Sequence, residues 1–371
     1  MKNIEVPALA RVEGEGGLFI GLQDGKAVEI RLDIYEPPRF FEGFLVGRFL
    51  QEVPDITARI CGICPVAYQM SSVYALERAL GVTIHPQARL LRRLMYCGEY
   101  IESHALHIYL LQAPDMLGVQ SALELAATAP DVVKNALRLK KIGNNLLKAI
   151  GGRSVHPVNV CVGGFYRWPK AADLKALLPD LEWGLAASIE CAKWAATLPY
   201  PDLEIDYEFV ALHHPNEYGV IEGEVLSSKG RVLTIPEYEN GYIEEHVKHS
   251  NALHSHTVDG STYLVGPLAR LNLNNQQLLP AAKQALKDTG LELPLKNPYK
   301  SLLARAIELV HFYEEAIQLI NAYKPEGRSY VNLKLKAGEG TGATEAPRGL
   351  LYHRYKIDDQ GMVQFAKITP P

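Results

Sequence analysis

The stretch Arg59-Ile60-Cys61-Gly62-Ile63-Cys64-Pro65 holds two of the five cysteines of this 371-residue chain, separated by two residues. Two thiolates at this spacing can bind one soft metal ion, although most metal sites need more ligands. Proline is well tolerated in the first turn of a helix, so the sequence predicts a helix from about Val66 to Leu80 with the cysteine pair at its N-terminal end. There the helix dipole and the nearby Arg59 would lower the pKa of the thiols.

A low thiol pKa suits metal ligation and thiol redox chemistry equally well, and a purely structural pair is a third interpretation. A thioredoxin-like site would need a βαβ unit around the motif, whereas here a helix is predicted before it. The residues alone favour a metal site and leave the other two interpretations open. The remaining cysteines stand singly in apolar stretches and are interpreted as small buried hydrophobic residues: Cys97, Cys161 and Cys191.

Outward from this motif, the chain shows helical patterns flanked by short strands. Alternating residues from Gly17 to Ile34, on both sides of Asp24-Gly25, predict a β-hairpin with a tight turn. Helical spacing is found at 39–53, 66–80, 87–112, 131–150, 171–198 with an interruption near Pro179, 278–288 and 298–323. Short β-prone runs occupy 204–233, 261–272, 329–336 and 349–368, and 338–349 is predicted to be a glycine-rich loop.

We therefore expect an α+β fold with a large, mostly helical core and peripheral short β-hairpins and sheets. The whole chain, 1–371, is predicted to form one domain. Its expected segments are an N-terminal β-hairpin and helix (1–60), a helical core (61–200), a β-rich insertion (201–275), further helices (276–325), and the glycine-rich loop with terminal strands (326–371).

Composition excludes several functional classes. A net charge of -4 provides no basic surface for nucleic acid, and no apolar run is long enough to span a bilayer. The N-terminus lacks the apolar run of a signal peptide. An odd number of scattered cysteines does not indicate a disulfide framework and favours a reducing cytoplasm.

Several other residues are candidates for chemistry. Glu13 and Glu42 are carboxylates in apolar or glycine-rich surroundings, and each could form an ion pair, carry a proton or bind a hard metal. His104 and His107 project from one face of a predicted helix and are interpreted as core histidines rather than a metal pair. The glycine-rich segment matches neither a dinucleotide-binding nor a P-loop pattern, so its glycines are expected to let the backbone pass close to something buried.

These segments together resemble the large subunit of nickel–iron (NiFe) hydrogenases, in particular the cytoplasmic NAD(P)-linked branch. Ordered matches cover nearly the whole chain. They are the segments 11–14 (RVEG), 36–42 (EPPRFFE), 59–65 (RICGICP), 103–107 (SHALH) with Pro114-Asp115, 151–157 (GGRSVHP) with 163–165 (GGF), 265–270 (VGPLAR) and 345–353 (EAPRGLLYH).

The resemblance implies a role for five residues. Cys61 would be a terminal thiolate on nickel, and Cys64 would bridge nickel and an iron that carries CO and cyanide. Glu13 would accept the proton from the metal site, and Arg348 would hold its guanidinium over the open coordination position. Glu42 would match a carboxylate ligand of a nearby magnesium ion. Soft thiolates, a polarising cation and a nearby carboxylate agree with the chemistry of heterolytic H2 cleavage.

Three departures from the family pattern stand out. Glu15 and Tyr68 occupy positions where many members have histidine. The family normally ends with a second C-x-x-C and a histidine shortly after it, and this sequence stops at Ile368-Thr369-Pro370-Pro371, a few dozen residues before a family member would end. The missing thiolates would come from a separate short peptide, the sequence would be a fragment, or the protein would be a non-catalytic scaffold.

The resemblance favours a catalytic-type oxidoreductase that interconverts H2 with protons and electrons, and the scaffold subunit of an electron-transfer complex is the alternative. Electrons would leave through an Fe–S small subunit, because this chain has too few cysteines for a cluster of its own. Diaphorase-type or other electron-transfer subunits would carry further Fe–S clusters and NAD(P) or another carrier. We expect a cytoplasmic heteromeric complex.

Overall fold

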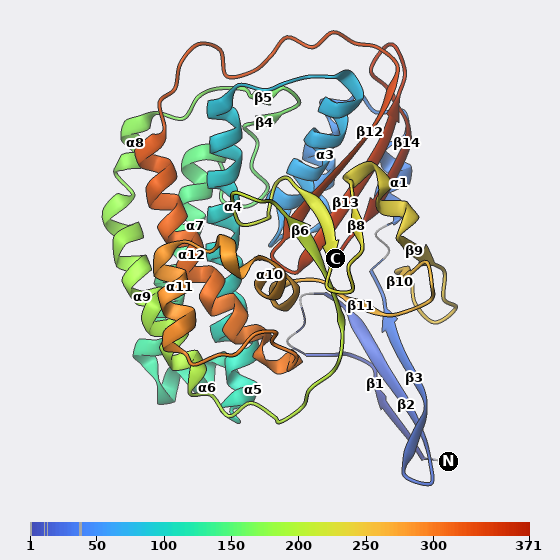
Figure 1. Cartoon of the computed structure of the whole chain (residues 1–371), viewed down its shortest axis with the longest axis vertical. Coiled ribbons are helices and arrows are strands. Elements are labelled where there is room, and N and C mark those ends of the chain that lie inside the picture. Colours follow the sequence, from blue (N-terminus) through green and yellow to red (C-terminus); the bar gives the residue numbers. More distant parts are fainter. Residues whose placement is uncertain (1, 11, 13, 37–38) are drawn as a thin grey trace.

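The computed structural model describes residues 2–10, 12, 14–36 and 39–371. A layer of long helices packs against a unit made of one buried helix and a three-stranded sheet, and a small N-terminal sheet projects from the molecule (Figure 1). In the helical layer, α4 (Pro86–Leu106) packs on α7 (Pro130–Gly151) and α12 (Ser301–Ala322), and α12 packs on α9 (Leu178–Ala196). The mixture of a helical core and peripheral sheets confirms the predicted fold class.

The predicted helix after the cysteine pair is confirmed as α3 (Pro65–Leu80), which is almost completely buried. It lies against β12 (Gly338–Ala346), the first strand of the antiparallel sheet β12-β13-β14. The predicted glycine-rich loop is therefore wrong, because its first nine residues form a buried strand. The expectation that these glycines let the backbone pass close to something buried agrees with the structure. A Cβ added to Gly338, Gly340 or Gly342 would collide with the backbone of α3. A glycine at every second position of a strand faces one side, so the strand can lie directly on the helix.

The N-terminal hairpin is also confirmed. β2 (Gly16–Gln23) and β3 (Lys26–Ile34) are antiparallel and joined by Asp24 and Gly25, both with positive φ. This is the two-residue turn that matches strand twist. β1 (Lys2–Val6) pairs with β2 and completes the sheet.

Other boundaries differ from the predictions where proline opens a new element. The predicted helix at 39–53 is two short helices, α1 (Arg39–Leu45) and α2 (Val53–Thr57). The predicted helix at 87–112 changes to a π-helix at His107–Gln112 and continues into α5 (Ala113–Met116), since Pro114 occupies a first-turn position of that helix. Residues 267–272, predicted as β-prone, lie in the buried helix α10 (Pro267–Asn274).

The remaining elements connect these parts. The helices are η1 (Ala58–Ile60), α6 (Ala122–Thr128), α8 (Ala171–Lys175), η3 (Ile235–Asn240), η4 (Asn275–Gln277), α11 (Pro280–Asp288) and η5 (Pro298–Lys300). The strands are β4 (Val160–Cys161), β5 (Gly164–Phe165), β6 (Glu208–His213), β7 (Glu224–Ser227), β8 (Val232–Leu233), β9 (Tyr242–Glu245), β10 (His254–Thr257), β11 (Tyr263–Leu264), β13 (Gly349–Ile357) and β14 (Val363–Thr369). Within the described part of the chain, the helices are all too short or too polar to cross a membrane.

Candidate active site

The two cysteines of the C-x-x-C motif lie at the N-terminal end of α3, as predicted. Cys61 follows η1 in an extended conformation, and Cys64 is the residue immediately before the first turn of α3. Their Cα atoms are 5.4 Å apart and their sulfur atoms are joined as a disulfide. The backbone N–H of Cys64 donates to the sulfur of Cys61 over 3.1 Å. The side chains are 9% and 2% exposed, so Cys61 is the one that solvent reaches.

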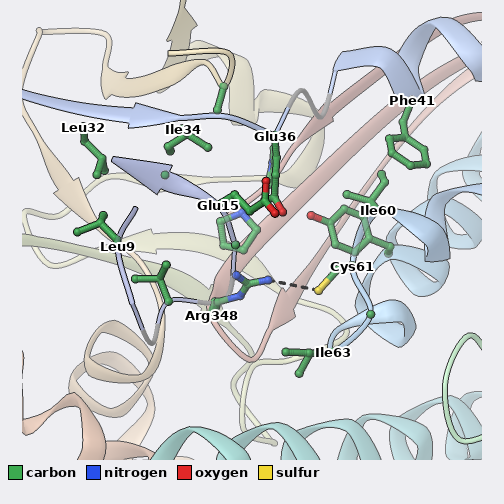
Figure 2. A pocket seen from close by; sticks show the side chains of 18 residues that line it. Leu9, Glu15, Leu32, Ile34, Glu36, Phe41, Ile60, Cys61, Ile63 and Arg348 are labelled. Atoms are coloured by element: carbon green, nitrogen blue, oxygen red, sulfur yellow. Dashed lines mark hydrogen bonds between the residues drawn. The ribbon is translucent and has the colours of Figure 1, made fainter. Parts of the chain in front are cut away.

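Arg348 provides a positive charge directly beside both sulfur atoms. Its Nη2 atom lies 3.3 Å from the sulfur of Cys61 (Figure 2). The same atom lies 3.5 Å from the sulfur of Cys64. The residue stands in the two-residue turn Pro347-Arg348 that joins β12 to β13. Arg59, which the sequence suggested as the neighbouring cation, instead pairs with the exposed Asp55 over 3.0 Å.

A cavity of about 750 Å³ is lined by Cys61 and Arg348. The N-terminal sheet contributes apolar side chains from β3, and α1 contributes Phe41 (Figure 2). Tyr68 of α3 also lines the cavity. Glu15 and Glu36 line the same cavity and are exposed. Pro370 and Pro371 complete the lining, so the last residues of this sequence lie near the cysteines.

Tyr68 lies on α3, four residues after Cys64. Burial raises its pKa to about 12; Arg348 opposes this shift, and Glu99 and Glu36 add to it. The phenol therefore stays protonated at neutral pH and can donate a hydrogen bond, but it cannot act as a base there.

Glu99 is a supporting residue that sequence reasoning missed. This completely buried carboxyl group on α4 accepts hydrogen bonds from the backbone N–H groups of Val66, at 2.6 Å, and Ala67, at 3.1 Å. Burial raises its pKa well above the ordinary value, against the effect of these N–H groups and of Arg348. Glu99 occupies the free N–H groups of α3 and so fixes the helix end that carries Cys64. Its position inside a helical pattern gave no sign of this contact.

The two predicted carboxylates are placed differently. Glu13 lies outside the described residues, as does Arg11. Glu42, on α1, is described: its Oε1 atom accepts a hydrogen bond from the backbone N–H of Ile368 on β14 at 2.8 Å. Glu42 is not among the described residues that line the cavity. This hydrogen bond ties α1 to the C-terminal strand β14.

The interpretation of the histidines and single cysteines as core residues agrees with the structure. Nε2 of His104 lies 2.8 Å from Oε2 of Glu308, with both side chains fully buried, and burial lowers the pKa of His104 to about 4. Burial likewise lowers the pKa of His107 to about 2. Cys97, Cys161 and Cys191 are free and buried.

The donor set at the cavity fits part of a soft-metal site. Two sulfur atoms lie side by side at a helix N-terminus, where thiolates are favoured once the disulfide is reduced. The described residues hold no group of three or more His, Cys, Asp or Glu side chains that could bind a metal ion by themselves. The chain thus offers two thiolates and a cation at a roomy cavity, and a four-thiolate centre would need two further sulfur donors.

Comparison with known proteins decides the family. The alpha subunit of sulfhydrogenase 1 from Pyrococcus furiosus is 34% identical over 386 residues, which cover 100% of this chain and 88% of the relative. The chain belongs to the nickel-dependent hydrogenase family. The family profile itself matches residues 39–158 of this hydrogenase chain, and that range includes the cysteine motif.

Other relatives also carry the names of hydrogenase subunits. One of them, from the F420-non-reducing hydrogenase vhu of Methanocaldococcus jannaschii, is 33% identical over 392 residues, which cover 98% of this chain and 93% of the relative. The beta subunit of the NAD-reducing hydrogenase HoxS of Cupriavidus necator is 27% identical over 417 residues, covering 99% and 84%.

Solved structures agree with this assignment. An NAD+-reducing NiFe hydrogenase in its H2-reduced state superimposes with a TM-score of 0.88 at 26% identity, covering 99% of this chain and 88% of that chain. A nickel–iron–selenium hydrogenase of Desulfomicrobium baculatum shares the fold, with a TM-score of 0.80 at 23% identity, covering 100% and 89%. The protein is thus a catalytic-type large subunit of the hydrogenase family, for which a nickel–iron centre is the expected cofactor.

Proposed function

We propose that this protein holds the nickel–iron centre of a hydrogenase that interconverts H2 with two protons and two electrons. The observation that carries the proposal is the Arg348 guanidinium, which lies beside the sulfur atoms of both Cys61 and Cys64. Arg348 and Cys61 line the cavity, and Cys64 is buried behind them. Soft sulfur donors and a cation that can stabilise developing negative charge are the parts that heterolytic cleavage of H2 requires.

The cysteines would be the ligands that this chain contributes. In the reduced protein, Cys61 would be a terminal ligand of nickel and Cys64 would bridge nickel and iron. The N-terminus of α3 and Arg348 both favour the thiolate form. Two further thiolates would come from another segment or a separate short chain, and the cavity wall at Pro370 and Pro371 is where such a segment would approach the cysteines.

Other residues would serve the reaction around the cysteines. The bound centre would supply a Lewis acid that polarises H2 and an acceptor for the two electrons. Arg348 would donate hydrogen bonds toward the reacting molecule and the diatomic ligands of the iron, here taken as CO and cyanide. Glu13 would accept the released proton. Glu42, already bonded to the backbone of β14, would be a carboxylate ligand for magnesium.

The electrons would leave through an Fe–S small subunit, and from there to a diaphorase-type or another electron-transfer subunit in the cytoplasm. Relatives named as alpha or beta subunits of hydrogenases support a heteromeric assembly. The named relative that reduces NAD supports NAD(P) as one candidate acceptor.

The alternative is a non-catalytic scaffold subunit, and the Cys61–Cys64 disulfide is the observation that favours it. A disulfide has no thiolate to offer a metal. The two functions therefore differ in whether the pair is reduced and metallated in the assembled protein.

The test is to purify the complete complex anaerobically and measure its nickel and iron content, its infrared bands for CO and cyanide, and H2-dependent reduction of a viologen dye. The enzyme predicts nickel and iron near one atom each at this site, diatomic bands and dye reduction. A complete complex without nickel, diatomic bands or H2 uptake would establish the scaffold function instead.

A further inference from the structure

The position of Arg348 depends on a turn with little freedom of its own. Pro347 and Arg348 connect two strands that pair as far as Ala346 and Gly349. Gly349 has a φ of +147°, and a Cβ on it would lie 2.5 Å from Cγ2 of Val265. A Cβ on Gly266 would lie 2.5 Å from the carbonyl oxygen of Arg348. The loop before α10 therefore packs directly against the turn.

Arg270, one helical turn into α10, binds the same turn from the inside. Its Nη1 atom donates to the carbonyl oxygen of Ala346 at 2.9 Å, and its Nη2 atom donates to that of Pro347 at 2.8 Å. These are the two carbonyl groups that immediately precede Arg348. A planar guanidinium that holds two successive carbonyl groups fixes the direction in which the next residue leaves the backbone.

Two buried carboxylates hold Arg270 in turn. Glu308 on α12 accepts hydrogen bonds from Nε and Nη2 of Arg270 at 2.7 and 2.8 Å. Glu345 on β12 accepts one from Nη1 of Arg270 at 3.0 Å. The three side chains are fully buried. Tyr218 and His104 bond to the two oxygen atoms of Glu308 at 2.7 and 2.8 Å. Each of these groups is fixed by a partner on another element, so the guanidinium has one orientation.

We propose that Arg270 is a positioning residue for Arg348: by holding the carbonyl groups of Ala346 and Pro347, it keeps the Arg348 guanidinium beside the sulfur atoms of Cys61 and Cys64. Arg270 itself does not line the cavity and would touch no reactant. The inference deepens the proposed function, because it names what maintains the cation at that site. It can be tested on the reduced, metal-free chain, so its outcome is independent of whether the complex binds nickel.

The chain offers a matched control for a purely structural role. Arg92 forms a comparable bidentate pair with Glu77, at 2.8 and 2.6 Å, and both side chains are buried. Arg92 also donates to a carbonyl group, that of Cys161, at 3.4 Å. None of these residues lines the cavity. Removing Arg92 should therefore destabilise the fold without moving Arg348.

The experiment compares the alkylation rate of Cys61 by iodoacetate, an anion, with that by neutral iodoacetamide in the reduced full-length chain. Mass spectrometry of the peptide that contains Cys61 and Cys64 separates these thiols from the buried cysteines. Both reagents attack the same thiolate, so the ratio of the two rates reports the positive charge near the sulfur and cancels the thiolate fraction. A nearby unit charge in a wet pocket changes such a ratio by about fivefold.

We expect Arg348→Met to lower the iodoacetate-to-iodoacetamide ratio about fivefold. Arg270→Met should lower it nearly as much, and the double variant no further than Arg348→Met alone. Arg270→Lys, which keeps the charge but cannot hold both carbonyl groups, should also lower the ratio. Arg92→Met should leave it unchanged. A triple variant combines Arg270→Met with Glu308→Gln and Glu345→Gln, so that no buried carboxylate is left unpaired. Circular dichroism verifies that each variant is folded.

The proposal is overturned if the folded Arg270 variants keep the wild-type ratio while Arg348→Met lowers it. It is equally overturned if Arg92→Met lowers the ratio as much as Arg270→Met, since general loosening would then explain the effect. If the methionine variants fail to fold, Arg270→Lys is the deciding variant. A wild-type iodoacetate-to-iodoacetamide ratio in folded Arg270→Lys would then overturn the proposal.

Discussion

The two sides of the cavity are supported in different ways. The cysteine side is the end of one helix, whose free N–H groups are bonded to a single carboxyl group, that of Glu99. The arginine side is a hairpin turn held by Arg270, which is itself held by Glu308 and Glu345 from two other elements. One side depends on local helix geometry and the other on a buried network of charges.

The difference shows where precision is needed. Two sulfur atoms at a helix N-terminus are placed by backbone geometry, because Cys61 and Cys64 are only three residues apart. A long, flexible arginine side chain needs its backbone fixed from outside if its charge is to stay within 3.3–3.5 Å of a target. The following predictions test this contrast, beginning with the largest expected effect.

Removing the cation should affect turnover far more than metal content. We expect Arg348→Met, and to a smaller extent Arg348→Lys, to reduce the rate of H2 oxidation by about 10²–10³-fold, as for loss of one preorganised charge-stabilising donor. Nickel content should remain near that of the wild type, because the thiolates are unchanged. A viologen assay with nickel analysis measures both. A variant that retains full activity would remove Arg348 from the reaction.

The Arg270–Glu308 pair on the arginine side and Glu99 on the cysteine side should contribute differently to the free energy of unfolding. Glu308→Ala leaves the buried Arg270 charge without its main partner, and we expect a loss of about 3–5 kcal/mol in the free energy of unfolding. Glu99→Ala leaves two backbone N–H groups unsatisfied and should cost about 1–3 kcal/mol. Chemical denaturation of both variants gives the comparison. Equal losses, or a larger loss for Glu99→Ala, would contradict the distinction between the two sides.

Glu345 should make the stability of the arginine side depend on pH. Burial raises the pKa of Glu345 to about 7, while Arg270 and the N–H of Leu212 oppose the shift and Glu308 adds to it. A folded-state pKa above the unfolded value of about 4.5 means that the folded protein binds more protons between these values. Glu345 therefore contributes its full stabilisation to the free energy of unfolding below about pH 4.5. This stabilisation, about 3 kcal/mol at most, is lost as the pH rises to about 7.

Glu345→Gln should remove this slope, which is measured by denaturant unfolding at pH 4.5–7.5 in both proteins. Only the difference between them is informative, because the lowered pKa of His104 gives a slope of the opposite sign. Glu190→Gln, at an exposed pair with Lys193, is the control that should leave the slope unchanged. A wild-type slope that persists in Glu345→Gln would show that another group is responsible.

The smallest effect is expected at Arg59. Sequence reasoning placed this cation beside the cysteines, but it pairs with Asp55 at the surface. Arg59→Ala should change the free energy of unfolding by no more than about 1 kcal/mol and leave the metal content unaltered. Thermal unfolding and nickel analysis check both. A large loss of nickel would restore Arg59 to the site.

Much of this arrangement could be read from local patterns. The hairpin at Asp24-Gly25 and the helix beginning at Pro65 each depend on residues within a few positions of one another. Arg348 was given a role by the family resemblance, whereas Arg270 and Glu345 lay in matched segments without a role and Glu308 lay outside them. Arg270 lies 75 residues from Glu345 and 38 from Glu308 in sequence, and β-propensity even assigned its segment to the wrong element. Side-chain networks of this kind follow from the fold and are invisible to periodicity.

The glycine-rich segment shows the opposite case. Its composition predicted a loop, because glycine disfavours strands in general. The same glycines are required here, since β12 lies directly on the backbone of α3 and leaves no space for a Cβ. A low intrinsic propensity was overridden by a tertiary contact, and that contact brings the Arg348 turn to the cysteine end of α3.

The central claim is that Cys61 and Cys64 bind the metal from this side. Nickel K-edge X-ray absorption of the purified complex, compared with its Cys61→Ser and Cys64→Ser variants, tests it most directly. We predict sulfur-dominated coordination in the parent protein, loss of nickel or of a nickel–sulfur contribution in each serine variant, and no change in Cys191→Ala. Full nickel content with unaltered sulfur coordination in both serine variants would contradict the account.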